Sequence, residues 1–405
     1  MSELAIGYPD LSTSDKLRLS QVVLYAVLLA PVSLIVAGSG VSANYLFALL
    51  LLFPEGYRQN KDALVYVVFI SLSFLVGVLL FSGLDGDFLL RQTISFGLTM
   101  LGALLLFLRL KVRREEFLAA VVLASVLYSA FAIWIVATRG FSLANIFFIK
   151  SGMREYVTDW PQRYAVILVF AFFVALGRWT RGLTWALASL AILSCIFLTF
   201  TRAAWLGVFV GGVIYLARWP KRFSVTSRRS RIYVLVSAAV TVGLLIYVLS
   251  NELVSQALMR IFDRLWMITE SNPAELSVRS SEGYRLALWG SVLKVLETNP
   301  ISGTGFAGAN LVIEGVGSAH SEYVDVLLRT GAFGLFLYLW FWGKLLRFYK
   351  RVDRSVLAGL VAIFVIGFFH ETTKLSYGAL IFFVLLNQAY QDAGSRPPIR
   401  EPAIS

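Results

Sequence analysis

Cysteine, histidine and charged residues are scarce in this 405-residue chain. A single Cys excludes a disulfide scaffold and any multi-Cys metal site, and two His leave little room for a His-rich metal centre. Charged residues make up 15% of the chain, whereas an ordinary globular domain has roughly a quarter. This composition excludes a cytosolic enzyme, a disordered chain and a coiled coil.

The chain instead contains long runs of apolar residues. Hydrophobic residues make up 58% of the chain, and its mean hydropathy is +0.75. Because a helix needs about 20 mostly apolar residues to cross a bilayer, the sequence predicts an all-α integral membrane protein with about twelve transmembrane helices. The expected spans are 21–37, 41–54, 63–83, 93–108, 117–137, 163–177, 183–200, 203–217, 232–249, 331–346, 355–370 and 375–391.

The distribution of Lys and Arg predicts the orientation, because short cytoplasmic loops hold an excess of them. With the N-terminus inside and the spans alternating, the cytoplasmic side receives 23 Lys and Arg and the outer side receives 13. We therefore expect both termini in the cytoplasm. The predicted organisation is spans one to nine in 1–249, a long, partly helical outer loop or cap in 250–321, spans ten to twelve in 322–391 and a cytoplasmic tail in 392–405.

Both histidines fall on the predicted outer face. His320 ends the long loop and precedes a helix that carries Asp325 and Arg329 one turn apart. Ionisable groups at the edge of a span are costly and often functional, which favours a catalytic role for His320. The alternatives are that His320 is an ordinary polar interfacial residue and that Asp325 and Arg329 neutralise each other. For His370, which ends the eleventh predicted span, we expect only an interfacial role.

Three arginines of the outer face are candidate anion ligands. Arg202 stands in a tight turn between two spans, where a positive outer charge works against insertion and is better explained by an anionic partner. Arg279 and Arg285 lie in the long loop. The guanidinium fork matches phosphate oxygens bidentately, which a Lys does not. The alternative is that Arg202 snorkels to the surface and that the loop arginines are solvated charges.

A Gly-rich turn at 300–308 follows a stretch of the loop with helical periodicity, 284–296. Glycines allow backbone N–H groups to approach an anion, but this turn lacks the Lys-Ser/Thr of a P-loop. A simple tight turn is the alternative. The sequence contains neither a metal-binding constellation nor a nucleotide-binding signature, so we expect any reaction to use an already activated substrate.

Three segments together resemble the O-antigen ligase and polymerase superfamily of polytopic bacterial membrane enzymes. Residues 202–206, Arg-Ala-Ala-Trp-Leu, fit the family's Arg-x3-Leu pattern. Residues 285–305 are similar to its Arg…Trp…Pro-x-x-Gly-x-Gly stretch. Residues 320–334 fit the His-Asn/Ser/Gln-x9-Gly-x-x-Gly pattern of the ligases. The order, the spacing and the common outer location of the three motifs carry the resemblance.

The resemblance implies glycan transfer from undecaprenyl pyrophosphate to a sugar hydroxyl, at the periplasmic face of the bacterial inner membrane and without a metal or a cofactor. By the same resemblance, Arg202 and Arg285 would stabilise the charge that develops on the leaving pyrophosphate, and His320 would take the proton of the acceptor. The other residues implied at the substrate site are Arg279, Tyr284, Trp289, Gly303, Gly305, Ser321 and Glu322.

Two reactions and one different class of function stay open. A ligase uses lipid A–core as the acceptor, whereas a polymerase uses another lipid-linked repeat unit. The sequence favours the ligase, because the Arg-x3-Leu pattern and the His-Asn/Ser/Gln-x9-Gly-x-x-Gly pattern of the ligases both fit residue by residue. A transporter of an anionic solute is the alternative from a different class. Against transport, the ionisable residues avoid the centres of the spans and no internal repeat is evident.

Overall fold

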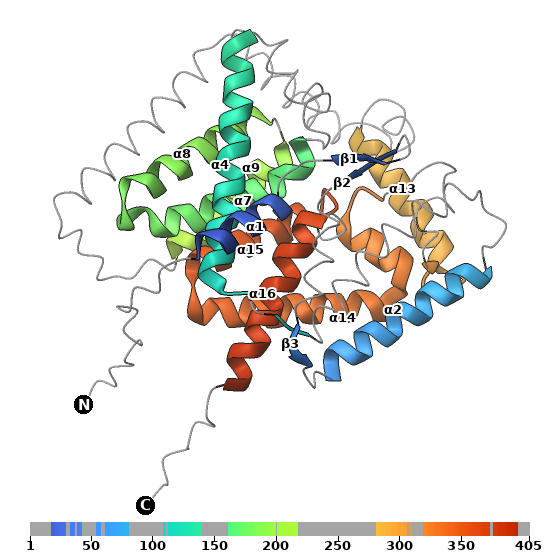
Figure 1. The fold of residues 1–405 in the computed structure, drawn as a ribbon. Coiled ribbons are helices and arrows are strands. Elements are labelled where there is room, and N and C mark those ends of the chain that lie inside the picture. Colours follow the sequence, from blue (N-terminus) through green and yellow to red (C-terminus); the bar gives the residue numbers. More distant parts are fainter. Residues whose placement is uncertain are drawn as a thin grey trace, which may run out of the picture.

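The structure, a computed structural model, consists mainly of helices (Figure 1). It describes residues 18–29, 33–36, 39–42, 54–57, 61–80, 108–110, 112–139, 161–199, 201–217, 281–305, 308, 319–372 and 376–395. The predicted spans 41–54, 93–108 and 232–249, together with residues 250–280 of the predicted outer loop, lie wholly or largely outside the described residues.

Most of the described helices coincide with predicted spans, because long apolar runs specify them. The helices are α1 Leu19–Leu29, α2 Lys61–Leu80, α4 Arg114–Arg139, α7 Pro161–Arg178, α8 Leu183–Leu198, α9 Arg202–Ala217, α13 Ser281–Leu296, α14 Glu322–Val352, α15 Arg354–Ile366 and α16 Ser376–Ser395, with a 3-10 turn at Trp179–Arg181. Helix α13 confirms the helical periodicity at 284–296. Helix α14 begins nine residues before its predicted span.

Two short strand pairs depart from the all-α prediction. Strand β1, Ser33–Val36, pairs antiparallel with β2, Ser39–Ser42. Strand β3, Pro54–Tyr57, pairs antiparallel with β4, Leu108–Leu110. The first predicted span, 21–37, is therefore helical only to Leu29. The sequence gives a reason, since Pro31 lacks the N–H that would continue the helix, and the β-branched Ile35 and Val36 favour an extended backbone.

Helix α7 lies at the centre of the bundle. It is apolar on all sides, and its residues from 164 to 175 are buried. Helices α4, α8, α9, α15 and α16 pack against it. Glycines allow the closest approaches: a Cβ at Gly211 would overlap the Phe173 ring, and one at Gly359 would overlap Phe170. The hydrophobic core of the described bundle is therefore centred on α7.

Large apolar side chains face outward from the bundle. Among them, Leu187 of α8 is 55% exposed and Phe209 of α9 is 69% exposed. Such surfaces are unfavourable in water but suit the hydrocarbon of a bilayer. Three stretches of described helix are long and apolar enough to span a membrane, namely 114–134, 164–181 and 322–352. The structure thus agrees with a membrane protein.

Helix α14 is broken at Gly331, where the Gly-rich turn docks. Gly331 has φ 65° and ψ −172°, outside the helical region. The backbone bond that an unbroken helix would make from Ala332 N–H to the Leu328 oxygen is replaced by two others. Ala332 N–H donates to the Pro300 oxygen over 2.8 Å, and Thr304 N–H donates to the Leu328 oxygen over 2.7 Å. The break therefore attaches residues 300–304 to α14.

Gly331→Ala is expected to destabilise the protein. A Cβ at position 331 would lie 2.1 Å from the Ile301 oxygen, and the positive φ disfavours any L side chain. Backbone strain of this kind costs about 1 to 3 kcal/mol, before the steric overlap is added. Thermal unfolding in detergent measures the effect. Gly343→Ala in the same helix, where a Cβ meets nothing within 4 Å, is the matched control and should leave the unfolding temperature unchanged.

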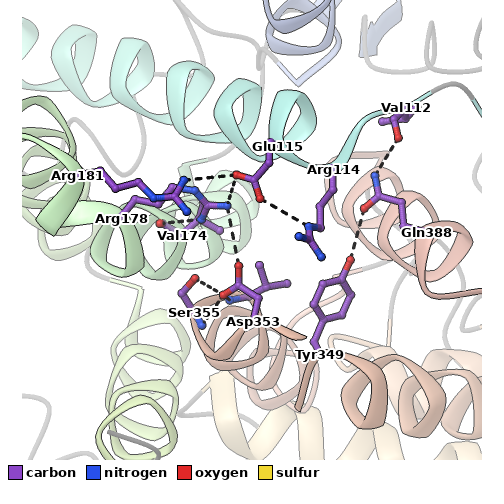
Figure 2. A network of polar contacts seen from close by, with 11 residues as sticks. Val112, Arg114, Glu115, Val174, Arg178, Arg181, Tyr349, Asp353, Ser355 and Gln388 are labelled. Atoms are coloured by element: carbon purple, nitrogen blue, oxygen red, sulfur yellow. Dashed lines mark hydrogen bonds and ion pairs between the residues drawn. The ribbon is translucent and has the colours of Figure 1, made fainter. Parts of the chain in front are cut away.

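Ion pairs join the helices at the end of the bundle where α7 ends and α15 begins (Figure 2). Arg178 Nη2 lies 2.9 Å from Glu115 Oε2 of α4 and 3.9 Å from Asp353 Oδ2, just before α15. Arg181 Nη1 lies 3.8 Å from the same Glu115 oxygen. This region, defined by Glu115, Arg178 and Asp353, is termed the ion-pair end. It joins three loops that the charge pattern assigns to the cytoplasmic side.

Candidate active site

The opposite end of the bundle, where α14 begins and α15 ends, brings together candidate residues from separate elements. It is termed the histidine end and is defined by Arg285, His320 and His370. Trp289 joins α13 to this end, since its indole Nε1 donates to the Ala319 oxygen over 2.9 Å. Arg285 lies one turn before Trp289 on the same face of α13. The bond therefore brings Arg285 toward His320, the residue after Ala319.

His320 is exposed and has an unusual backbone conformation. Its φ is 55°, and among the described residues it is the only non-glycine with a positive φ. Such a conformation is uncommon outside glycine, although His tolerates it better than most residues. Strained backbone positions are found at functional sites when the surroundings fix them. The imidazole of His320 is therefore both accessible and constrained at its backbone.

Ser321 and Glu322, both expected at the substrate site, are buried and bonded to the turn that follows α15. Glu322 N–H donates to the Gly367 oxygen over 2.8 Å, and Glu322 Oε2 accepts from Thr372 N–H over 2.6 Å. The Ser321 hydroxyl donates to the Gly367 oxygen over 3.4 Å. These bonds fix both sides of the turn 367–372 against the start of α14.

His370 lies in this turn, beside the other residues of the histidine end. Burial lowers the pKa of the His370 imidazole, and the positive charges of Arg285 and His320 lower it further, to about 4. Sequence reasoning assigned His370 only an interfacial role. No sequence signal could have found it, because its neighbours Arg285 and His320 come from two segments that are distant in the sequence.

Arg202 begins α9 at the same end of the bundle. Helix α9 packs antiparallel to α15, because Gly207 lies against Ala362 and Ile366, whereas Gly211 lies against Ala358. The start of α9 therefore lies beside the end of α15, where the turn with His370 follows. Arg202 is partly exposed. The structure thus places Arg202 on the side of the bundle that carries the histidines.

The Gly-rich turn has a packing role. Gly303 has φ 68°, Gly305 has φ 65°, and Gly303 N–H donates to the Asn299 oxygen over 3.0 Å. A Cβ at Gly303 would come within 2.5 Å of the Gly331 nitrogen. The glycines therefore permit close docking onto α14, and the Gly303 N–H is already used. This agrees with the tight-turn alternative to a phosphate cradle.

Asp325 and Arg329 form a buried ion pair, as one of the sequence alternatives expected. Arg329 Nε lies 2.8 Å from Asp325 Oδ2, and the two side chains are 6% and 5% exposed. The Arg329 guanidinium also lies against Gly308, where an added Cβ would come within 2.7 Å of it. The ion pair therefore packs against Gly308 of the Gly-rich turn.

The remaining expected site residues are not placed. Arg279 lies outside the described residues, and of Tyr284 only the backbone in α13 is described. Within the part of the chain that the structure describes, no group of three or more His, Cys, Asp or Glu side chains could hold a metal ion. The histidine end instead offers arginines that can bind an anionic group and imidazoles that can hydrogen-bond or accept a proton.

Comparison with known families supports the resemblance seen in the motifs. Residues 186–339 match the family model described as O-antigen ligase. The matched segment contains Arg202, Arg285 and His320 and ends just after the break of α14. None of the curated proteins matches the chain. The match confirms that this segment resembles the O-antigen ligase and polymerase superfamily, as its motifs predict.

Proposed function

We propose that the protein is an O-antigen ligase that transfers a glycan from undecaprenyl pyrophosphate to a sugar hydroxyl of lipid A–core. The observation that carries the proposal is the placement of Arg285 and His320 at one end of the bundle, both near His370 and both within the segment that matches the ligase family. Arg202 begins a helix at the same end. A phosphate-binding cation beside an accessible base suits transfer from an activated donor.

In the proposed reaction, the acceptor hydroxyl oxygen bonds to the anomeric carbon of the donor glycan. The bond from that carbon to the pyrophosphate oxygen breaks, and its electron pair leaves with undecaprenyl pyrophosphate. Arg202 and Arg285 stabilise the charge on the leaving group through bidentate hydrogen bonds. His320 takes the hydroxyl proton. Arg279, Tyr284 and Trp289 would complete the substrate site, while Ser321 and Glu322 fix the turn beside it.

We propose that the histidine end faces the periplasm, because the charge pattern assigns the ion-pair end to the cytoplasm. Cys introduced singly at positions 202, 285 and 320 should react with a membrane-impermeant thiol reagent in spheroplasts. The native Cys195 is buried and is changed to Ser in this background. Arg181→Cys, at the ion-pair end and 58% exposed in its side chain, is the control and should react only after permeabilisation. The reverse pattern would contradict the orientation.

A polymerase is the second enzyme reaction that the same site could perform, since only the acceptor differs. A transporter of an anionic solute is the alternative from another class. Purified protein in detergent, incubated with lipid-linked glycan and an acceptor, should form the transferred product. Detergent removes the closed compartment that transport needs. Solute uptake into vesicles without any transfer in detergent would overturn the enzyme assignment.

A further inference from the structure

We propose that His370 is a second histidine of the transfer site, which hydrogen-bonds the sugar substrate while His320 takes the proton. This proposal rests on the proposed function. It starts from the turn 367–372, which the α15 helix presents beside Arg285 and His320. The turn was not part of the motifs, and its place in the site comes only from the packing of α13, α14 and α15.

Hydrogen bonds on both sides of His370 fix its position. Before it, Gly367 accepts from Glu322 N–H over 2.8 Å, and His370 N–H itself donates to the Ile366 oxygen over 2.9 Å. After it, Thr372 N–H donates to Glu322 Oε2 over 2.6 Å. Tyr323 packs against the same turn, since its ring lies 4.5 Å from the Phe368 ring between centroids, and its hydroxyl donates to the Phe364 oxygen of α15 over 2.6 Å. The side chain is thus carried by a backbone anchored at three points.

Several charged residues of the described elements lie near His370, and Arg202 begins α9 beside the end of α15. Arg285 comes from α13, His320 from the segment before α14, Glu322 from the first turn of α14, and Glu371 from the turn itself. The Glu322 carboxylate already accepts a hydrogen bond from Thr372 N–H. Burial is the larger cause of the lowered His370 pKa, and the two cationic neighbours add to it. Protonation of His370 is therefore disfavoured.

A neutral imidazole suits substrate contact better than proton transfer. It has one N–H donor and one acceptor nitrogen, so it can hydrogen-bond a sugar hydroxyl in either direction. With a pKa of about 4, it is a weak base near neutral pH. The exposed His320 is accessible to the acceptor hydroxyl and is therefore the proposed base. The competing interpretation is that His370 is only a polar residue at the membrane interface.

Three variants separate these interpretations in a transfer assay with lipid-linked glycan and acceptor. His370→Phe keeps the ring but can neither donate nor accept a hydrogen bond. It should lower kcat/KM by roughly 10- to 100-fold, mainly through KM for the acceptor. His370→Gln should recover most of this loss and keep the wild-type pH dependence, because His320 is the proposed base. Phe369→Leu, in the same turn, is the matched control and should transfer normally. Elution on size exclusion checks folding.

If the wild type transfers glycan, two outcomes would overturn the proposal. Full activity of His370→Phe would mean that the side chain does not contact substrate. Loss of the pH dependence in His370→Gln would mean that His370 is the base. If the wild type itself transfers nothing, the proposed function fails and the His370 role falls with it.

Nitrogen-15 NMR of the labelled histidines gives a readout besides activity, because the chain has only two of them. At pH 5.5 the His370 imidazole should be neutral, whereas an ordinary His is mostly protonated. Arg285→Gln removes a cationic neighbour and should raise the His370 pKa. A His370 that titrates near pH 6.5 in the wild type would contradict the neutral-imidazole role.

Discussion

His320→Ala should reduce glycan transfer by roughly 10²- to 10⁴-fold, the usual contribution of general-base assistance. The side chain is exposed, so its truncation removes little packing, and the protein should stay folded and inserted. Initial rates with purified protein measure the loss. Only the neutral imidazole can accept a proton, so the wild-type rate should fall when His320 is protonated at low pH.

Two further variants at position 320 separate a base from a hydrogen-bonding residue. His320→Gln keeps hydrogen-bonding capacity but cannot act as a base near neutral pH. His320→Asn does the same and also tolerates the left-handed backbone, so it controls for the strain at φ 55°. Both should stay nearly inactive. Near-normal turnover with a flat pH profile in either variant would make His320 a positioning residue.

Arg202→Lys should lose most of the transfer activity although it keeps the charge. The guanidinium binds two oxygens of a phosphate group through a planar fork, which an ammonium group cannot reproduce. Removal of a contact to developing charge costs on the order of 2 kcal/mol or more, which is about a 30-fold loss in rate. Measurement of kcat with saturating donor tests this, because the contact strengthens in the transition state.

Arg347→Lys is the matched control for the Arg202 change, since Arg347 is an exposed arginine near the other end of α14. It should transfer glycan at the wild-type rate. Arg285→Lys should behave like Arg202→Lys, and Arg279→Lys should lose less. Equal rates for Arg202→Lys and the wild type would mean that Arg202 is a plain surface charge.

The sequence predicts the helices far better than it predicts their contacts. Apolar runs specify α7, α8 and α9 within a few residues, because burial on all sides or in lipid leaves little choice of structure. The break of α14 at Gly331 was not predicted, because it depends on the docking of residues 300–304, which no local pattern encodes. The strand pairs were missed for a related reason: short apolar segments are ambiguous between helix and strand.

The candidate site was predicted in part. The sequence singles out His320, Arg202 and Arg285 by their place on the predicted outer face and by their motifs, and the structure places them at one end of the bundle. His370 was not singled out, because its surroundings arise only when α13, α14 and α15 pack together. Single residues with costly charge can therefore be singled out from sequence as candidates, whereas neighbours that the fold assembles cannot.

The most direct test of the proposed ligase reaction is a choice of acceptors. The protein is purified, reconstituted in liposomes with undecaprenyl-pyrophosphate-linked glycan, and offered lipid A–core and a second lipid-linked repeat unit in equal amounts. The ligase account predicts that the glycan moves to lipid A–core and that undecaprenyl pyrophosphate is released in equal quantity. Transfer only to the lipid-linked repeat unit, with lipid A–core unmodified, would contradict it and make the protein a polymerase.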